Sequence, residues 1–140
     1  RGENITTIFV NNTVYGMTGG QMAPTTLVGQ KTTTCPGGRC RENEGMPIRM
    51  TEIIASLGGV AFAERVAVNN IKNIKKAKKA VAKAFEYQTK EVGFSFVEVL
   101  ATCPTNWRMT PLQANKRIET EMIPYFPLGN FKDVLAKEEK

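Results

Sequence analysis

The chain has 140 residues, 41% of them hydrophobic, and carries a formal net charge of +6 without any histidine. This length allows one domain or part of a larger one, and the hydrophobic content is that of a folded globular protein. The lack of histidine excludes histidine acid–base catalysis and histidine metal ligands within the chain. No apolar run approaches the roughly 20 residues that a membrane-spanning helix requires, so we expect no membrane role.

The N-terminus carries no targeting signal that we recognise. The sequence begins at Arg1 rather than at a methionine, and no signal-peptide pattern follows it. We therefore expect a fragment or a processed chain, with a cytoplasmic location as the default.

The first predicted element is a β-strand over residues 5–10, which are β-branched or apolar and end at the pair Asn11-Asn12. We expect this strand to be buried on both faces. Residues 13–49 are rich in Gly, Thr and Pro and show no sustained periodicity. Loops of this length are uncommon in compact domains and are usually functional.

Regular elements alternate in the middle of the chain. We predict a short helix over residues 51–57, a strand over 60–66, a helix from the Asn69 or Asn70 cap to about residue 89, and a strand over 94–100. Residues 101–140 predict one helix after Pro111 and otherwise an irregular tail. Strands that alternate with helices are typical of an α/β fold with a parallel sheet and flanking helices.

The predicted helix over residues 71–89 holds most of the excess positive charge. Its apolar positions are spaced by three and four, which predicts one buried face and a solvated lysine face. An alternative is that the lysines contact nucleic acid or an acidic partner, although no aromatic platform accompanies them. The predicted buried residues are Ile71, Ile74, Ala77, Val81 and Phe85, and the lysines are Lys72, Lys75, Lys76, Lys78, Lys79 and Lys83.

The segment from Asn11 to Gln21 carries the strongest functional signal. It places two amides at a strand end and then a turn with Thr18 and two consecutive glycines. Amide and carbonyl oxygens suit Mg²⁺, and free backbone N–H groups in glycine-rich turns suit a diphosphate. The same residue types are also common in turns with no ligand, and this alternative stays open on the sequence pattern alone.

The run Val14-Tyr-Gly-Met-Thr-Gly-Gly-Gln21 resembles the second half of the thiamine-diphosphate motif in β subunits of 2-oxoacid:ferredoxin oxidoreductases. The resemblance continues through Pro24-Thr-Thr26, Lys31-Thr-Thr-Thr34, Phe96-Val-Glu-Val-Leu100 and Cys103-Pro-Thr105, and covers most of residues 3 to 107. The 2-oxoisovalerate and 2-oxoglutarate types look most similar. The Gly-Asp-Gly-Asp segment that supplies a carboxylate ligand in the family does not occur in this sequence.

The resemblance implies a set of cofactor residues. The Asn12 side chain and the Val14 carbonyl would bind Mg²⁺, and Gly16, Met17 and Thr18 would line the diphosphate of thiamine diphosphate. Cys103 would be one ligand of a [4Fe–4S] cluster whose other cysteines lie outside this sequence. Without the resemblance, Cys103 is a small buried apolar residue. Cys35 and Cys40 are expected to be free loop thiols; half a metal site or a catalytic nucleophile is an alternative use.

The resemblance also implies a function. The enzyme would oxidatively decarboxylate a 2-oxoacid to an acyl-CoA and pass electrons to ferredoxin, and this chain would supply part of the Mg²⁺–thiamine diphosphate site. Residues 1–103 would form the C-terminal half of the cofactor-binding domain, and residues 104–140 a tail with one helix. Partners would include an α subunit, other subunits, ferredoxin, the 2-oxoacid and coenzyme A, in an oligomer. The alternative is a non-enzymatic α/β module that binds an acidic partner or nucleic acid through the lysine-rich helix.

Overall fold

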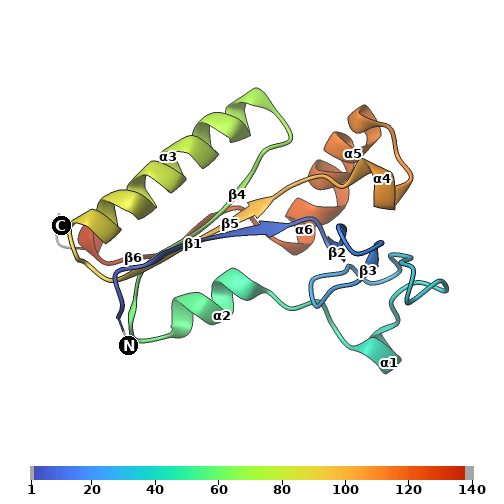
Figure 1. The fold of residues 1–140 in the computed structure, drawn as a ribbon, viewed down its shortest axis with the longest axis horizontal. Coiled ribbons are helices and arrows are strands. Elements are labelled where there is room, and N and C mark those ends of the chain that lie inside the picture. The colour runs from blue at the N-terminus through green and yellow to red at the C-terminus, as the bar shows by residue number, and fades with distance from the viewer. Residues whose placement is uncertain (1, 138–140) are drawn as a thin grey trace.

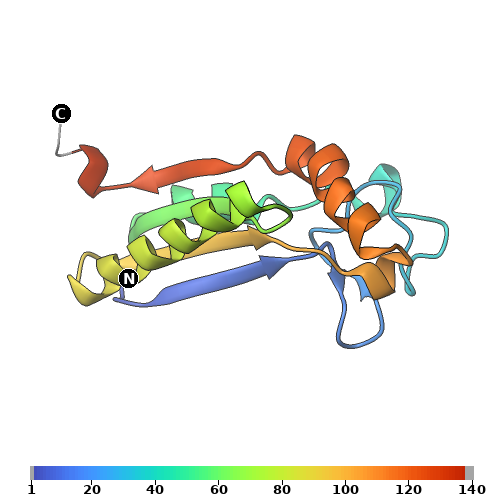
Figure 2. The ribbon, with the colours of Figure 1, turned by 90° about the horizontal axis from the view of Figure 1, so that it is seen from above.

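A computed structural model describes residues 2–137. Its main sheet has the strand order β1-β5-β4-β6, which can be followed from bottom to top in Figure 2. β1, β5 and β4 are parallel, as predicted, whereas β6 runs antiparallel to β4. The strands are β1 (Thr6–Asn11), β4 (Val60–Ala67), β5 (Phe94–Leu100) and β6 (Gly129–Asp133), and a separate hairpin contains β2 (Val14–Tyr15) and β3 (Gln21–Met22).

Helices cover the sheet on both faces. α3 lies on one face and α2 on the other, while the shorter C-terminal helices lie beyond the sheet, near the loops that follow β1 (Figure 1). The helices are α1 (Arg41–Glu44), α2 (Met50–Ser56), α3 (Ile71–Thr89), α4 (Pro104–Trp107), α5 (Pro111–Arg117), the π-helix η1 (Ile118–Met122), α6 (Ile123–Tyr125) and the 3₁₀-helix η2 (Leu135–Lys137).

The C-terminal segment adds a strand that the sequence did not predict. β6 pairs with the edge of β4 and makes the sheet mixed rather than parallel. Asp133 fixes its end, because it accepts hydrogen bonds from Tyr87 and Lys83 of α3. The prediction missed β6 because Gly129–Asp133 is short and polar. It becomes a strand by pairing with an edge that would otherwise be free.

The predicted buried face of α3 is wrong at most of its positions. Ile71 and Phe85 are 75% and 49% exposed, and the buried residues are Ala77, Ala80, Ala84 and Tyr87. A row of alanines lets the helix approach the sheet closely: the hydroxyl of Thr6 donates to the carbonyl oxygen of Ala84 at 3.1 Å. The lysines do lie mainly on exposed positions, as expected.

The prediction that the first strand is buried on both faces is also wrong. β1 is an edge strand of this sheet, paired with β5 alone, and its Val10 side chain is 58% exposed. The apolar sequence of β1 predicted burial, but it does not indicate how many neighbouring strands pair with β1.

An apolar cluster lies at the carboxyl ends of the parallel strands. It joins the C-terminal helices to the sheet and to the loop after β1, and Tyr125 of α6 donates to the carbonyl oxygen of Pro47 at 2.8 Å. None of the helices in residues 2–137 is long and apolar enough to span a membrane. The buried members of the cluster are Val14, Leu27, Ala67, Leu100, Trp107, Ala114, Ile118, Met122 and Phe126.

The orientation of α3 can be tested by overpacking. We expect Ala84→Leu to lower the free energy of unfolding by about 1–3 kcal/mol, because Ala84 is fully buried against the sheet. Ala82→Leu on the exposed face of the same helix should change it by less than about 0.5 kcal/mol. Denaturant unfolding measures both values, and equal losses would show that the helix is rotated from the observed orientation.

The bond between Tyr87 and Asp133 predicts a pH dependence. Burial, followed by the hydrogen bond to Asp133, raises the pKa of Tyr87 from 10.0 to about 12. The stabilisation is therefore complete below pH 10 and is lost as the pH rises towards 12. We expect the difference in unfolding free energy between wild type and Tyr87→Phe to shrink over this range. The exposed Tyr15→Phe should show no such change, and identical behaviour of the two variants would contradict the assignment.

Candidate cofactor site

A strained turn follows β1. Thr13 is fully buried and has φ of +60°, a left-handed backbone conformation that is a clear outlier for a β-branched residue. Such a conformation costs about 1–3 kcal/mol and persists only where neighbours impose it. Here the N–H of Thr13 donates to Asn11 Oδ1 at 3.1 Å, and its carbonyl oxygen accepts from Thr26 Oγ1 at 2.6 Å and Gln30 Nε2 at 3.2 Å. The turn between Asn12 and Val14 is therefore fixed on both sides.

A buried carboxylate holds the residue that begins this turn. Glu98 is fully buried in β5, and its Oε1 accepts from Asn11 Nδ2 at 2.7 Å. Its Oε2 accepts from Arg65 Nε at 2.8 Å and from the Thr51 hydroxyl. Arg65 is also fully buried and forms a second ion pair with Glu52, which lowers the pKa of Glu52 although partial burial opposes the shift. Ion pairs therefore connect β5, β4 and α2, and the hydrogen bond from the Asn11 amide to Glu98 joins β1 to them.

The long segment after the turn is shaped by another buried cation. The Arg39 guanidinium is 5% exposed and donates to the carbonyl oxygens of both sides of the loop at 2.8–3.4 Å. This set of bonds gives a loop without regular structure a defined shape, which holds Thr26 near the turn. The acceptors are the carbonyls of Ala23, Pro24, Thr26, Glu44, Gly45 and Met46.

The segment after β5 contacts the turn from the other side. Trp107 Nε1 donates to the carbonyl oxygen of Asn12 at 3.1 Å. Asn106 Nδ2 lies 3.1 Å from both the carbonyl oxygen of Gly16 and Cys103 Sγ. Glycine is required at position 20, where φ is +80° and a Cβ would lie 2.6 Å from Asn106 Oδ1.

The structure brings four of the six predicted site residues together. Asn12, the buried Val14, Gly16 and Cys103 surround one small volume: a Cβ on Gly16 would lie 3.2 Å from Cys103 Sγ and 3.6 Å from Asn12 Nδ2. The amide oxygen of Asn12 accepts only a long bond of 3.4 Å from the N–H of Val14. The Asn12 side chain and the Val14 backbone therefore lie next to each other in a turn that is fixed by hydrogen bonds.

The other two predicted residues lie at the tip of the β2–β3 hairpin. The Met17 side chain is fully exposed, and the Thr18 hydroxyl donates to Gln21 Oε1 at 2.7 Å. Within residues 2–137, the backbone N–H groups of Gly16, Met17 and Thr18 donate to no protein acceptor. Backbone N–H groups without a protein acceptor in a glycine-rich turn are available to bind an anion.

Cys35 and Cys40 are free thiols, as expected. Cys40 Sγ donates to Glu42 at 2.8 Å, and this bond is the main cause of the lowered pKa of Glu42. Among the residues that the structure describes, no three His, Cys, Asp or Glu side chains are grouped closely enough to hold a metal ion. The alternative that Cys35 and Cys40 form half a metal site therefore gains no partner ligand from the described residues.

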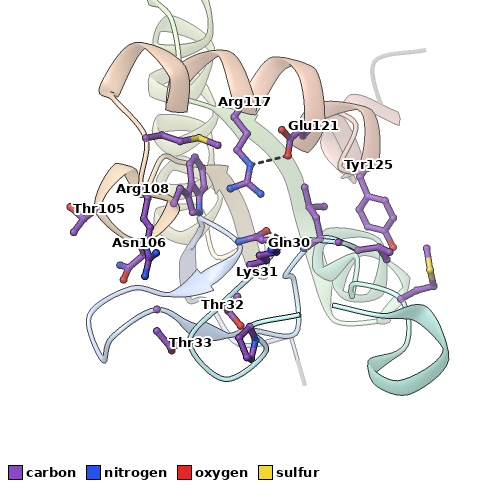
Figure 3. Close-up of a pocket in the computed structure, with 18 residues that line it drawn as sticks. Gln30, Lys31, Thr32, Thr33, Thr105, Asn106, Arg108, Arg117, Glu121 and Tyr125 are labelled. Carbon is purple, nitrogen blue, oxygen red and sulfur yellow. Dashed lines mark hydrogen bonds and ion pairs between the residues drawn. The ribbon is translucent and has the colours of Figure 1, made fainter. Parts of the chain in front are cut away.

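A groove of about 1120 Å³ opens beside the turn, between residues 27–36 and the C-terminal helices (Figure 3). Trp107 and Gln30 belong both to its lining and to the bonds that fix the turn. Asn106, Trp107, Gln30 and Arg39 were not predicted from the sequence as contributors. The one available signal was the single tryptophan, Trp107, which lies two residues after Cys103-Pro104-Thr105.

Comparison with known families identifies the class. Residues 1–99 match the family described as thiamine pyrophosphate enzyme, C-terminal TPP binding domain. The chain belongs to this family, and thiamine diphosphate is the cofactor that the family domain binds.

The particular relatives are subunits of 2-oxoacid oxidoreductases. The chain is 50% identical over 139 residues to ketoisovalerate oxidoreductase subunit VorA of Methanothermobacter marburgensis, and 35% identical over 136 residues to pyruvate synthase subunit PorB of Pyrococcus horikoshii. These alignments cover 99% and 93% of the chain but 29% and 38% of the relatives, so the chain spans about a third of their length.

The fold has a solved counterpart in the 2-oxoglutarate:ferredoxin oxidoreductase of Magnetococcus marinus, whose structure has 2-oxoglutarate, coenzyme A and succinyl-CoA bound. The TM-score is 0.62 at 19% identity, and the match covers 99% of this chain and 53% of that one. The α/β architecture with flanking helices is thus shared with a 2-oxoacid oxidoreductase.

The buried ion pair below the turn predicts a large loss of stability. We expect Arg65→Met to lower the free energy of unfolding by about 3–5 kcal/mol, because it leaves the Glu98 carboxylate buried without a cation. Glu52→Gln removes a partner whose side chain is 30% exposed, and it should cost about 1 kcal/mol or less. Chemical denaturation measures both. Equal small losses would mean that the Glu98 charge is not held by Arg65.

Proposed function

We propose that the chain supplies part of the Mg²⁺–thiamine diphosphate site of a 2-oxoacid:ferredoxin oxidoreductase. The enzyme would oxidatively decarboxylate 2-oxoisovalerate or a similar 2-oxoacid, transfer the acyl group to coenzyme A and pass the electrons to ferredoxin. The observation that carries this proposal is the rigid Asn12–Val14 turn beside three backbone N–H groups without protein acceptors. Two hard oxygen donors next to phosphate-binding N–H groups match a magnesium diphosphate.

The residues present fit this cofactor in defined roles. Asn12 Oδ1 and the Val14 carbonyl would hold Mg²⁺, and Gly16, Met17 and Thr18 would direct backbone N–H groups to the diphosphate. When bound, thiamine diphosphate supplies the nucleophilic carbon and the electron sink for decarboxylation. The work of this chain is to bind and orient, since its fixed turn sets the position of the diphosphate before substrate arrives. No side chain of this site acts as an acid or base in our proposal.

Cys103 is proposed as a ligand of a [4Fe–4S] cluster. Its side chain is partly buried, its sulfur lies next to Gly16, and the Asn106 amide donates a hydrogen bond to that sulfur. Four cysteine ligands are needed for such a cluster, so this residue could supply one of them.

The proposal extends to domain limits, assembly and location. Residues 1–103 would form the C-terminal half of the cofactor-binding domain, with residues 104–140 as a tail packed on it. The relatives are named as subunits, and we propose that this chain likewise works in an oligomer with an α subunit and further subunits. Its reaction with coenzyme A and ferredoxin would place it in the cytoplasm, with no role for membranes or nucleic acid.

The alternative function, contact with nucleic acid or an acidic partner through α3, gains no specific support. Lys83 forms an ion pair with Asp133, and the remaining lysines of the helix lie along its exposed positions. This arrangement is that of an ordinary solvated helix face.

Asn12 provides the direct test. In the protein purified in its native assembly, Asn12→Ala should weaken Mg²⁺-dependent binding of thiamine diphosphate by about tenfold or more, which is about 1.4 kcal/mol. Asn12→Asp keeps an oxygen donor at the same place and should retain binding. Isothermal titration calorimetry measures both, with melting temperatures to show that the assembly is intact. Equal affinity of wild type and Asn12→Ala would remove Asn12 from the ligand set.

A further inference from the structure

The groove beside the turn has a positive lining. Three cationic side chains, Lys31, Arg108 and Arg117, face it, and Glu121 is the single carboxylate among its lining residues. The charges come from separate parts of the chain, the loop after β3 and the helices after β5. With a volume of about 1120 Å³, the groove has room for either a small metabolite or a ligand of cofactor size.

Arg117 is the buried member of this set. It is 7% exposed, and its guanidinium carbon lies 4.5 Å from the centroid of the Trp107 ring. Its Nε donates to Glu121 Oε2 at 2.9 Å, and its two terminal NH₂ groups donate to no acceptor in residues 2–137. Figure 3 shows the guanidinium directed into the groove, towards the loop that carries Gln30 and Lys31. The terminal NH₂ groups are not among the buried atoms that lack a partner, so they reach the solvent of the groove and are available to an anion.

The backbone around Arg117 is unusual as well. α5 ends at this residue, and the π-helix η1 (Ile118–Met122) begins directly after it. Single π-helical turns are rare and occur frequently at functional sites. This feature is independent of the charges in the groove.

The groove also shares hydrogen bonds with the cofactor turn. Trp107, on which Arg117 stacks, donates to the carbonyl oxygen of Asn12, and Gln30 donates to that of Thr13. The Trp107 side chain alone would therefore separate a ligand at Arg117 from Asn12, which we propose as a Mg²⁺ ligand.

We propose that this groove binds an anionic substrate, with the terminal NH₂ groups of Arg117 making paired hydrogen bonds to a carboxylate or a phosphate. The inference rests on the proposed function, because that reaction supplies two ligands of this chemistry. These are the carboxylate of the 2-oxoacid and the phosphates of coenzyme A. Planar bidentate recognition is the property that arginine provides and lysine does not.

The experiment uses the thiamine-diphosphate-loaded protein in its native assembly. Calorimetry with 2-oxoisovalerate and, separately, with coenzyme A gives the dissociation constants for wild type, Arg117→Met and Arg117→Lys. We expect both substitutions to weaken one of the two ligands by about tenfold or more, since charge-assisted paired bonds are lost. The ligand that is weakened identifies which anion the groove binds.

Two further variants act as controls. Lys116→Met removes the same charge from the adjacent exposed position and should leave both affinities unchanged. Glu121→Gln removes the carboxylate that is paired with Arg117 and would repel an anion. It should strengthen, several-fold, the binding of the ligand that the Arg117 variants weaken. Because the Glu121 side chain is 52% exposed, this variant tests the site even if Arg117→Met does not assemble.

The outcomes separate this inference from the proposed function. Unchanged affinities for both ligands in Arg117→Lys and Glu121→Gln would overturn the inference. A loss of thiamine diphosphate binding in Arg117→Met, with melting temperature preserved, would also overturn it, because the groove would then belong to the cofactor. Wild-type protein that binds no thiamine diphosphate would instead contradict the proposed function.

Discussion

The arrangement of the site depends on one buried carboxylate. Glu98 lies in the central part of the sheet with no exposed surface and accepts from Arg65, Thr51 and Asn11. An unpaired charge at this depth would be strongly destabilising, and a hydrophobic pair of similar size would be at least as stable as the ion pair. Stability therefore does not explain why a carboxylate stands here. Its contact with Asn11 offers a functional reason for the carboxylate. Glu98 Oε1 orients the Asn11 amide, and this amide in turn holds the N–H of Thr13 in the turn that follows.

The strained turn follows from that orientation. Asn11 Nδ2 donates to Glu98, and Asn11 Oδ1 accepts from the N–H of Thr13. One side chain therefore links β5 to the backbone that follows β1. Thr26 and Gln30 then hold the carbonyl of Thr13 from the opposite side. A left-handed threonine needs such bonds on both of its peptide groups. The buried Thr13 lies between Asn12 and Val14, and shortly after it the N–H groups of residues 16–18 donate to no acceptor in residues 2–137.

Local sequence patterns predicted the helices and strands themselves better than they predicted which residues these elements bury. The helix cap at Asn70 and the bounds of β4, α3 and β5 follow from residue types that neighbours in the chain determine. The buried face of α3, the exposure of β1 and the existence of β6 depend on elements distant in the sequence, which periodicity does not describe. The site divides in the same way. Asn12 and Gly16 lie in a recognisable sequence motif. Trp107 donates to the carbonyl oxygen of Asn12 from 95 residues further along the chain, and no sequence pattern predicts this contact.

The contacts around the turn are compatible with the two ligands that we propose for this chain. Trp107, Gln30 and Thr26 all donate to backbone carbonyls of Asn12 or Thr13, so they fix the turn without using the Asn12 amide oxygen or the N–H groups of residues 16–18. Those groups face a magnesium diphosphate in our proposal. The ring of Trp107 stacks on Arg117 and lines the groove. Since the same side chain contacts both the turn and the groove, a shift of Trp107 would disturb both proposed sites together. Rigid support from the buried network below the turn is what would keep a cofactor and a substrate anion at a constant separation.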